Sequence, residues 1–161
     1  MPKRKLQVVK TKGENSLRHV WKHRDPFRVV FNFIIIYLAK YVPSMRMKNG
    51  LLQLTGMKIG KSASIGLAAM FDIFYPELIE IGENSIIGYN ATILAHEFLV
   101  NEFRTGRVRI GKDAMVGANA TVLAGVDIGN RATVSAATLV DGDVPENGFA
   151  KGNPMKTGGN S

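Results

Sequence analysis

Aliphatic side chains recur at every sixth position through the second half of the chain. A period of six is neither the 3.6-residue period of a helix nor the two-residue alternation of a strand. Glycine directly follows three of these positions, and a small or aliphatic residue lies two positions before five of them. The repeated positions are Ile110, Val116, Val122, Ile128, Val134 and Val140. We interpret each hexapeptide as a short strand plus a corner, and a strict short repeat of this kind indicates a solenoid.

The same phase is present earlier in the chain, where Ile59, Ile65 and Phe71 are six apart, as are Ile81, Ile87 and Ile93. Three hexapeptides make one triangular coil, so the pattern predicts coils over 59–76, 81–98, 110–127 and 128–145. Two insertions, 77–80 and 99–109, both follow a third face. Polar residues that tolerate left-handed backbone lie three positions after a repeated aliphatic and predict corners. These residues are Asn84, Asn90, Asp113 and Asn119.

The segment before the repeats has a different pattern. Residues 29–39 are apolar except for Asn32, a stretch too short to span a bilayer and without the cleavage pattern of a signal peptide. Asp25 and Pro26 form a helix start signal, and Pro43 is a stop, so we expect a helix over about 26–41. Its sides are mostly apolar, which predicts burial, packing in an oligomer or contact with a membrane surface. We divide the chain into a basic N-terminal segment (1–56), a β-helix (57–156) and a flexible tail (157–161).

The positive charge of the chain belongs to its N-terminal segment. The formal net charge is +8, but residues 1–50 hold 12 Lys and Arg against two acids, and the remainder is nearly neutral. This argues against nucleic acid binding along the repeats and leaves an anionic partner near the N-terminus, such as membrane lipid or a phosphorylated ligand. The chain has no cysteine, so it has no disulfide framework and no thiol nucleophile. A cytoplasmic location suits that composition.

Few residues of the repeat body carry candidate chemistry. His96 is the one histidine there, and it lies at a corner just before the second insertion, so a solvent-facing imidazole would stand beside a loop. Asp72 lies on the same face one coil earlier, where stacking of Phe71 under Ile93 would bring it near His96. We expect Asp72, Tyr75, Glu97 and Phe98 to line a substrate pocket. His19 and His23 are four apart and could share a helical face, but without a carboxylate pattern we expect surface residues and no metal site.

Several motifs make the chain resemble the hexapeptide-repeat acyltransferases over about residues 57–156. Within that superfamily it looks most like the branch of maltose, galactoside and xenobiotic O-acetyltransferases. The motifs are Ile93-Leu94-Ala95-His96 before a loop, Val108-Arg109-Ile110-Gly111-Lys112-Asp113, Asp143-Val144-Pro145 and Gly152-Asn153-Pro154. The resemblance implies a left-handed parallel β-helix that works as a homotrimer. Residues 1–50 carry no signature of this family.

The resemblance also implies a reaction and its residues. By this resemblance His96 aligns with a general base that takes the proton of an acceptor hydroxyl, such as that of a carbohydrate, as that oxygen attacks acetyl-CoA, and no metal is expected. Coenzyme A would lie between two subunits. Its predicted contacts are Ala118, Ala136, Lys151, Gly152, Asn153 and Lys156.

Two departures from the family pattern bear on the acceptor. Glu97 replaces the proline common after the histidine, and Met70 stands where galactoside-type relatives have Asn. Two alternatives to acetyl transfer remain. One is a non-catalytic trimeric scaffold whose N-terminus touches a membrane. The other is a γ-type carbonic anhydrase, which needs three histidines on zinc.

Overall fold

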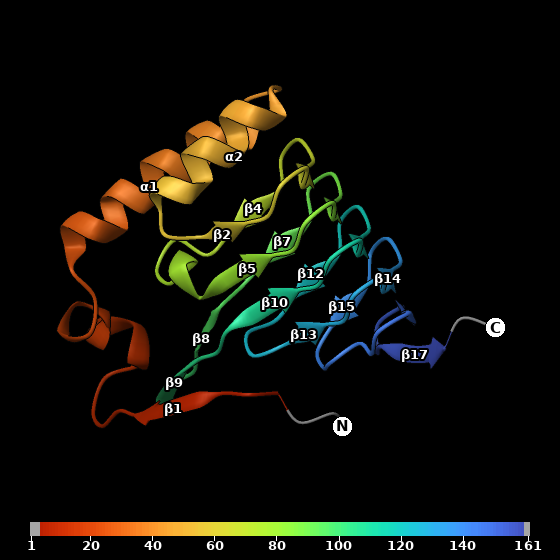
Figure 1. Cartoon of the computed structure of the whole chain (residues 1–161). Coiled ribbons are helices and arrows are strands. Elements are labelled where there is room, and N and C mark those ends of the chain that lie inside the picture. The colour runs from red at the N-terminus through yellow and green to blue at the C-terminus, as the bar shows by residue number, and fades with distance from the viewer. Residues whose placement is uncertain (1–3, 160–161) are drawn as a thin grey trace.

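Three narrow sheets, parallel except for the last strand, form a triangular prism, as Figure 1 shows for the computed structural model, which describes residues 4–159. The first sheet holds β2 (Lys58–Ile59), β5 (Ile79–Ile81), β10 (Val108–Ile110) and β13 (Asp127–Ile128). The second holds β3 (Ser64–Ile65), β6 (Ile86–Ile87), β11 (Met115–Val116), β14 (Thr133–Val134), β16 (Gly148–Lys151) and β17 (Lys156–Gly159). The third holds β4 (Met70–Phe71), β7 (Thr92–Ile93), β12 (Thr121–Val122) and β15 (Leu139–Val140).

The repeated aliphatic residues stack in register down the axis of the prism. In the third sheet Phe71 pairs with Ile93, Ile93 with Val122, and Val122 with Val140. All four side chains are at most 1% exposed. Fully burying one such side chain contributes roughly 1.5–3 kcal/mol. Because each coil covers the next, the stack as a whole offsets an ordering cost that one coil could not. The six-residue phase predicted from the sequence is confirmed.

Two of the three corners of the prism use left-handed backbone at residues other than glycine. The four predicted corner residues have φ between 53° and 58°. Their side chains also form ladders between coils: Asn84 donates to Asp113 at 2.8 Å, and Asn90 donates to Asn119 at 2.9 Å. The predicted role of these residues as corner formers is therefore confirmed.

The third corner, between the third and first sheets, holds both insertions. The first is the 3₁₀ turn η2 (Pro76–Leu78). The second is a hairpin of β8 (His96–Phe98) and β9 (Glu102–Thr105), which begins at His96 and not at Leu99 as predicted. The coil ends early because β8 pairs with β9 and leaves the third sheet. The N-terminal strand β1 (Gln7–Lys10) pairs with the other side of β9, so the N-terminal segment lies against this insertion.

Two helices cover the first coil, at the end of the prism opposite β17 (Figure 1). Helix α1 (Pro26–Tyr41) spans the range predicted from the sequence, with Asp25 accepting the capping hydrogen bond. Helix α2 (Met45–Leu54) follows, and the 3₁₀ helix η1 (Ser16–Lys22) precedes both. Side chains of α2 donate to carbonyls of the first coil that no further coil could reach: Asn49 to Ala63 at 2.8 Å and Gln53 to Ile59 at 3.1 Å. Covering an open sheet edge in this way prevents edge-to-edge association.

The outer face of α1 is apolar and exposed. Its inner face is buried, but eight large side chains on the other sides are at least 39% exposed. They are Phe27, Val30, Phe31, Phe33, Ile34, Tyr37, Leu38 and Tyr41. We expected burial, packing in an oligomer or contact with a membrane surface for this helix. Burial in the monomer therefore accounts for only one of its faces. Within residues 4–159, no helix combines the length and hydropathy needed to cross a membrane.

The C-terminal end differs from the flexible tail expected after residue 156. Strand β17 pairs antiparallel with β16, with Lys156 opposite Lys151, and reaches Gly159. The two strands extend the second sheet by hydrogen bonding, which a composition rich in glycine does not reveal. The last two positions of the predicted tail lie outside the described residues.

Lys48 links α2 to the first coil and supports a prediction about stability. Its side chain is buried, and its Nζ donates to the carbonyls of Ile65 and Gly66, both at 3.1 Å. Burial lowers the pKa of Lys48. We expect Lys48→Met to reduce the free energy of unfolding by about 1–3 kcal/mol, because the hydrophobic chain fills the space but leaves both carbonyls unpaired. Urea unfolding would measure this, with Lys61→Met, at an exposed corner, as the matched control. Equal stability of Lys48→Met and the wild type would contradict it.

Candidate active site

The third corner brings Asp72 and His96 together from successive coils. Asp72 follows β4, and His96 opens β8 just after β7. The pairing of β4 with β7 places Asp72 under Leu94, as the repeat phase predicted, and the turn of the chain into the hairpin carries the imidazole back over the carboxylate. The Nδ1 atom of His96 lies 2.5 Å from Oδ2 of Asp72. The imidazole is partly exposed and the carboxylate is completely buried.

The Asp72 carboxylate is fully engaged by the protein. Its Oδ1 accepts from the backbone amides of Phe74 at 2.8 Å and Tyr75 at 2.9 Å, and its Oδ2 accepts from the amide of Ala95 at 2.7 Å as well as from His96. An acceptor would have to displace one of these donors to reach it. These contacts therefore give Asp72 the position of a residue behind the imidazole, which differs from the acceptor contact that we expected.

Acid unfolding should depend on Asp72. Burial raises the pKa of this carboxyl. The hydrogen bond and charge of His96, together with the amides of Tyr75 and Ala95, lower the pKa by more than burial raises it, so it lies below its ordinary value. Between the folded-state pKa and the ordinary pKa of Asp, the unfolded chain binds more protons than the folded protein does. The contribution of Asp72 to the free energy of unfolding is therefore complete above about pH 4 and is lost as pH falls through the folded-state pKa. We expect the stability difference between wild type and Asp72→Asn to shrink below pH 4 in urea titrations. A difference that stays constant from pH 6 to 3 would contradict this.

Aromatic side chains surround the imidazole. The ring of Phe98 lies 4.7 Å from that of His96, and Phe74 stands edge-on to it at 5.0 Å. Tyr75 is 6.1 Å away, and burial raises the pKa of its phenol. The guanidinium of Arg24 stacks on the ring of Tyr75, 4.3 Å from its centre. His96, Tyr75 and Phe98, predicted as site residues, are thus neighbours in space, and Phe74 and Arg24 join them.

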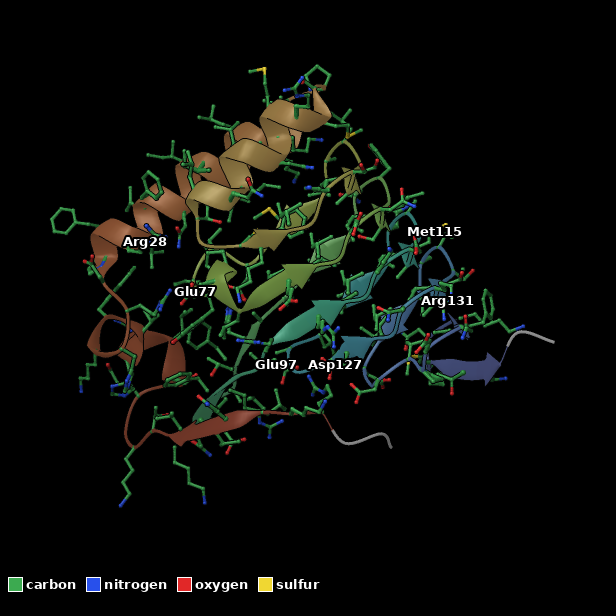
Figure 2. The ribbon with its side chains drawn as sticks, in the orientation of Figure 1. Arg28, Glu77, Glu97, Met115, Asp127 and Arg131 are labelled. Atoms are coloured by element: carbon green, nitrogen blue, oxygen red, sulfur yellow. The ribbon has the colours of Figure 1, made fainter. Side chains whose placement is uncertain are left out.

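Glu97 lies on the opposite face of β8 from His96 and Phe98, as alternation along a strand requires. Its carboxylate forms an ion pair with Arg4 and approaches Arg104 at 3.9 Å. The neighbouring Lys5 pairs with Asp127. Figure 2 shows Glu97 and Asp127 on the edge of the prism next to the N-terminal strand. The contacts of Glu97 therefore fix the N-terminal segment to the hairpin, a role different from the substrate contact that we expected.

A cavity of about 460 Å³ borders the same hairpin. It opens between the N-terminal segment and the third corner, and Thr105, the cross-strand partner of His96, lies in its wall. The other lining residues are Lys5, Leu6, Gln7, Leu78, Gly106 and Arg107. The insertions and the N-terminal segment thus create a recess at the third corner, beside the site, but Asp72, His96, Tyr75 and Phe98 are not among the residues that line it.

The predicted coenzyme A residues lie at a different edge of the prism. Ala118 and Ala136 follow β11 and β14 at the corner between the second and third sheets, and Gly152 and Asn153 follow β16 on the same side. The side chains of Lys151 and Lys156 are exposed beside them. The width of the third sheet separates this edge from His96, so one chain does not bring the two sets together.

The described residues can also be searched for a group of metal ligands. Within the described ranges, no three His, Cys, Asp or Glu side chains are grouped so as to hold a metal ion. His19 and His23 lie on and just after η1, away from the Asp72–His96 pair.

Comparison with known proteins places the chain in a family. The family model "Hexapeptide repeat of succinyl-transferase" matches residues 107–141. The chain is 51% identical over 154 residues to "Putative acetyltransferase YvoF" of Bacillus subtilis, covering 95% of this chain and 90% of that protein. A Staphylococcus aureus protein, "Putative acetyltransferase SAR0816", is 51% identical over 142 residues and 88% of each chain. The chain therefore belongs to the hexapeptide-repeat acetyltransferase family.

Solved structures agree on the fold, a left-handed parallel β-helix, as predicted. A maltose O-acetyltransferase from Clostridium difficile superposes with a TM-score of 0.64 at 17% identity, covering 84% of this chain and 88% of that one. The hexapeptide-repeat acetyltransferase VCA0836 of Vibrio cholerae, complexed with acetyl-CoA, gives 0.61 at 17% identity over 81% and 85%.

Proposed function

We propose that the protein is an acetyl-CoA-dependent O-acetyltransferase with His96 as its general base. The observation that carries this proposal is the pairing of His96 with a buried, fully hydrogen-bonded Asp72 at the corner of the prism that holds both insertions. An ionised Asp72 binds the Nδ1–H of a neutral imidazole, which leaves the lone pair of Nε2 for the substrate. Membership of an acetyltransferase family supports the acyl donor.

The reaction follows from this arrangement. Nε2 of His96 takes the proton of the acceptor hydroxyl while its oxygen attacks the thioester carbonyl carbon of acetyl-CoA. The carbon–sulfur bond then breaks, and the imidazolium returns the proton to the departing thiolate. Asp72 holds the ring in orientation throughout and stabilises the imidazolium while it carries the proton. The aromatic wall of Phe74 and Phe98 limits water around the ring and supports a carbohydrate acceptor packed against it.

The coenzyme must then come from a neighbouring subunit. Because the predicted coenzyme A residues lie across the third sheet from His96, we propose a homotrimer in which that edge of one chain faces the third corner of the next. Ala118 and Ala136 would meet the pantetheine arm, and Lys151 and Lys156 the phosphates. Light scattering that gives three chains per particle, and a cross-link between the two edges of different chains, would test this assembly. A monomer with full activity would overturn it.

An assay of acetyl transfer tests the function. Purified protein is mixed with acetyl-CoA and a panel of hydroxyl-bearing acceptors, with release of the free thiol and the mass of the product as readouts. Acceptor-dependent thiol release together with a product 42 Da heavier, the mass of an acetyl group in place of a proton, supports the proposal. Calorimetry that finds no binding of acetyl-CoA would overturn it.

The exposed face of α1 favours one addition, contact with a membrane surface. Aromatic and aliphatic side chains cover this face, while Arg28 and Lys40 lie at its margins, a pattern suited to anionic lipid. A non-catalytic scaffold would also bind membranes through this face of α1. Vesicle binding and acetyl-CoA affinity must therefore be measured together, because only the enzyme would show both. Sedimentation with phosphatidylglycerol vesicles should be lost in an Ile34→Gln, Leu38→Gln variant. Loss of the trimer in that variant, without vesicle binding by the wild type, would assign the face to a subunit contact instead.

A further inference from the structure

A strongly basic pocket lies beside the tip of the β8–β9 hairpin, apart from the Asp72–His96 pair. Its volume is about 230 Å³, and it forms where the end of β1 meets η1. Three lysines, two histidines and a threonine line it. They are Lys10, Thr11, Lys12, His19, Lys22 and His23.

Nothing in the described part of the chain neutralises this cluster. None of its lysines or histidines forms an ion pair within residues 4–159, and Glu102, the cross-strand neighbour of Lys10, binds Arg104 at 2.5 Å instead. The position of His19 and Lys22 at the end of η1 suits the helix dipole, but Lys10 comes from another element. Like charges gathered in one recess repel each other unless an anion joins them.

Two buried atoms of the pocket residues also lack partners. Oγ1 of Thr11 and Nε2 of His19 are inaccessible to solvent, and neither has a hydrogen-bond partner within the described ranges. Buried polar groups in folded proteins are normally hydrogen-bonded, so each such atom needs an explanation. Neither atom is open to solvent in this structure, so a ligand with several acceptor oxygens would reach them only after the Thr11 and His19 side chains turn toward the pocket.

We propose that this pocket binds a phosphoryl group. The donors among its lining side chains are ammonium groups and imidazole N–H groups, around a volume suited to a small anion. A phosphoryl group presents several strong acceptor oxygens and a charge near −2, which matches a cluster of this charge better than a single carboxylate does. Lys10, Lys12 and Lys22 supply the charge, and His23 supplies a ring N–H.

A continuous row of rings connects the pocket with the imidazole of the active site. The ring of His23 lies 5.0 Å from Phe103, Phe103 lies 6.0 Å from Phe98, and Phe98 lies 4.7 Å from His96. Lys10 is three residues along and two strands across from His96 in the sheet of β1, β9 and β8, a separation of about 14 Å from strand geometry. By alternation Lys10 lies on the face that carries Glu97, so a ligand that joins the two groups would pass round the edge of this sheet. The phosphoryl group would therefore belong to an acceptor whose hydroxyl reaches His96; this assignment to the acceptor, unlike the pocket itself, rests on the proposed function.

Direct binding tests the pocket without any assay of activity. We expect inorganic pyrophosphate to bind the full-length protein in calorimetry, and a Lys10→Gln, Lys22→Gln variant to bind at least about tenfold more weakly. Lys58→Gln, Lys61→Gln, an equal loss of two charges at exposed positions of the first coil, should bind as the wild type does. Thermal unfolding of each variant shows that it is folded. Absence of binding, or binding that the two substitutions leave unchanged, would overturn the proposal.

Further arms identify the source of the phosphoryl group. Binding should persist with saturating coenzyme A and in His96→Ala; displacement by coenzyme A would overturn the assignment to the acceptor. Glucose 1-phosphate that competes with pyrophosphate supports a soluble phosphorylated acceptor, whereas competition only by phosphatidylglycerol vesicles supports a lipid headgroup. If the acetyl transfer assay fails while pyrophosphate binding and its loss are both observed, the pocket stands and the reaction does not.

Discussion

Replacing His96 with alanine should lower kcat/KM for acetyl transfer by about 10²–10⁴-fold, the usual contribution of a general base. No other histidine among the described residues pairs with a buried carboxylate, so the variant has no substitute for Nε2. The loss should fall on kcat, because the imidazole acts on the acceptor proton and not on coenzyme A. Steady-state rates of thiol release, at saturating and limiting acetyl-CoA, measure both parameters.

The control for this prediction must show that the fold survives. His96 packs against aromatic rings, so His96→Gln, which keeps a polar side chain of similar length, accompanies the alanine variant, and Lys61→Ala serves as a distant surface control. Both His96 variants should keep the oligomeric state and the coenzyme A affinity of the wild type. Activity within a factor of two of the wild type in either variant would exclude His96 as the base.

The repeat made the prism predictable from sequence. Each coil depends on its neighbours through the same few positions, so the spacing of Ile93, Val122 and Val140 is enough to state which residues lie above one another. The same arithmetic placed Asp72 beneath Leu94 and close to His96. Periodic sequence thus predicts contacts between coils because the geometry that generates the period also generates the contacts.

The insertions and the N-terminal segment follow no such period, so their contacts could not be predicted from the sequence. Nothing in the sequence around Arg4 indicates that it pairs with Glu97, more than ninety residues away, or that Arg24 covers Tyr75. The hairpin starts at His96 because β8 finds β9 and β1 as partners, a choice made by hydrogen bonding between distant segments. Alternation along a strand could have placed Glu97 on the face opposite His96, had the strand been recognised.

The role of Asp72 shows the limit of spacing most clearly. Spacing located the residue, but only the three-dimensional structure shows that both carboxylate oxygens accept hydrogen bonds, from three amides and one imidazole. A carboxylate with free lone pairs would suit an acceptor hydroxyl. A saturated one suits a residue that orients the base.

We therefore expect Asp72→Asn to impair catalysis through His96. An Asn amide facing Nδ1 would donate a hydrogen bond to it, which favours the tautomer with its proton on Nε2, and that nitrogen could then no longer accept the proton of the acceptor. If the NH2 group of the Asn faces Nδ1, it also faces the N–H of Ala95, and that donor then loses its acceptor. The expected fall in kcat is up to about 10⁴-fold, the size seen when the orienting Asp of a Ser–His–Asp triad becomes Asn. The KM for acetyl-CoA should not change.

A double-mutant cycle separates orientation from general support of the fold. If Asp72 acts only through the imidazole, the Asp72→Asn, His96→Ala double variant should be no slower than His96→Ala alone, because residues that work as a unit are not additive. The rates are measured at a temperature where circular dichroism shows all three variants folded. Losses that multiply would contradict the orienting role and return Asp72 to a direct contact with substrate. Partial recovery in Asp72→Glu, which keeps the carboxylate but shifts it by one methylene, would further support the positioning role.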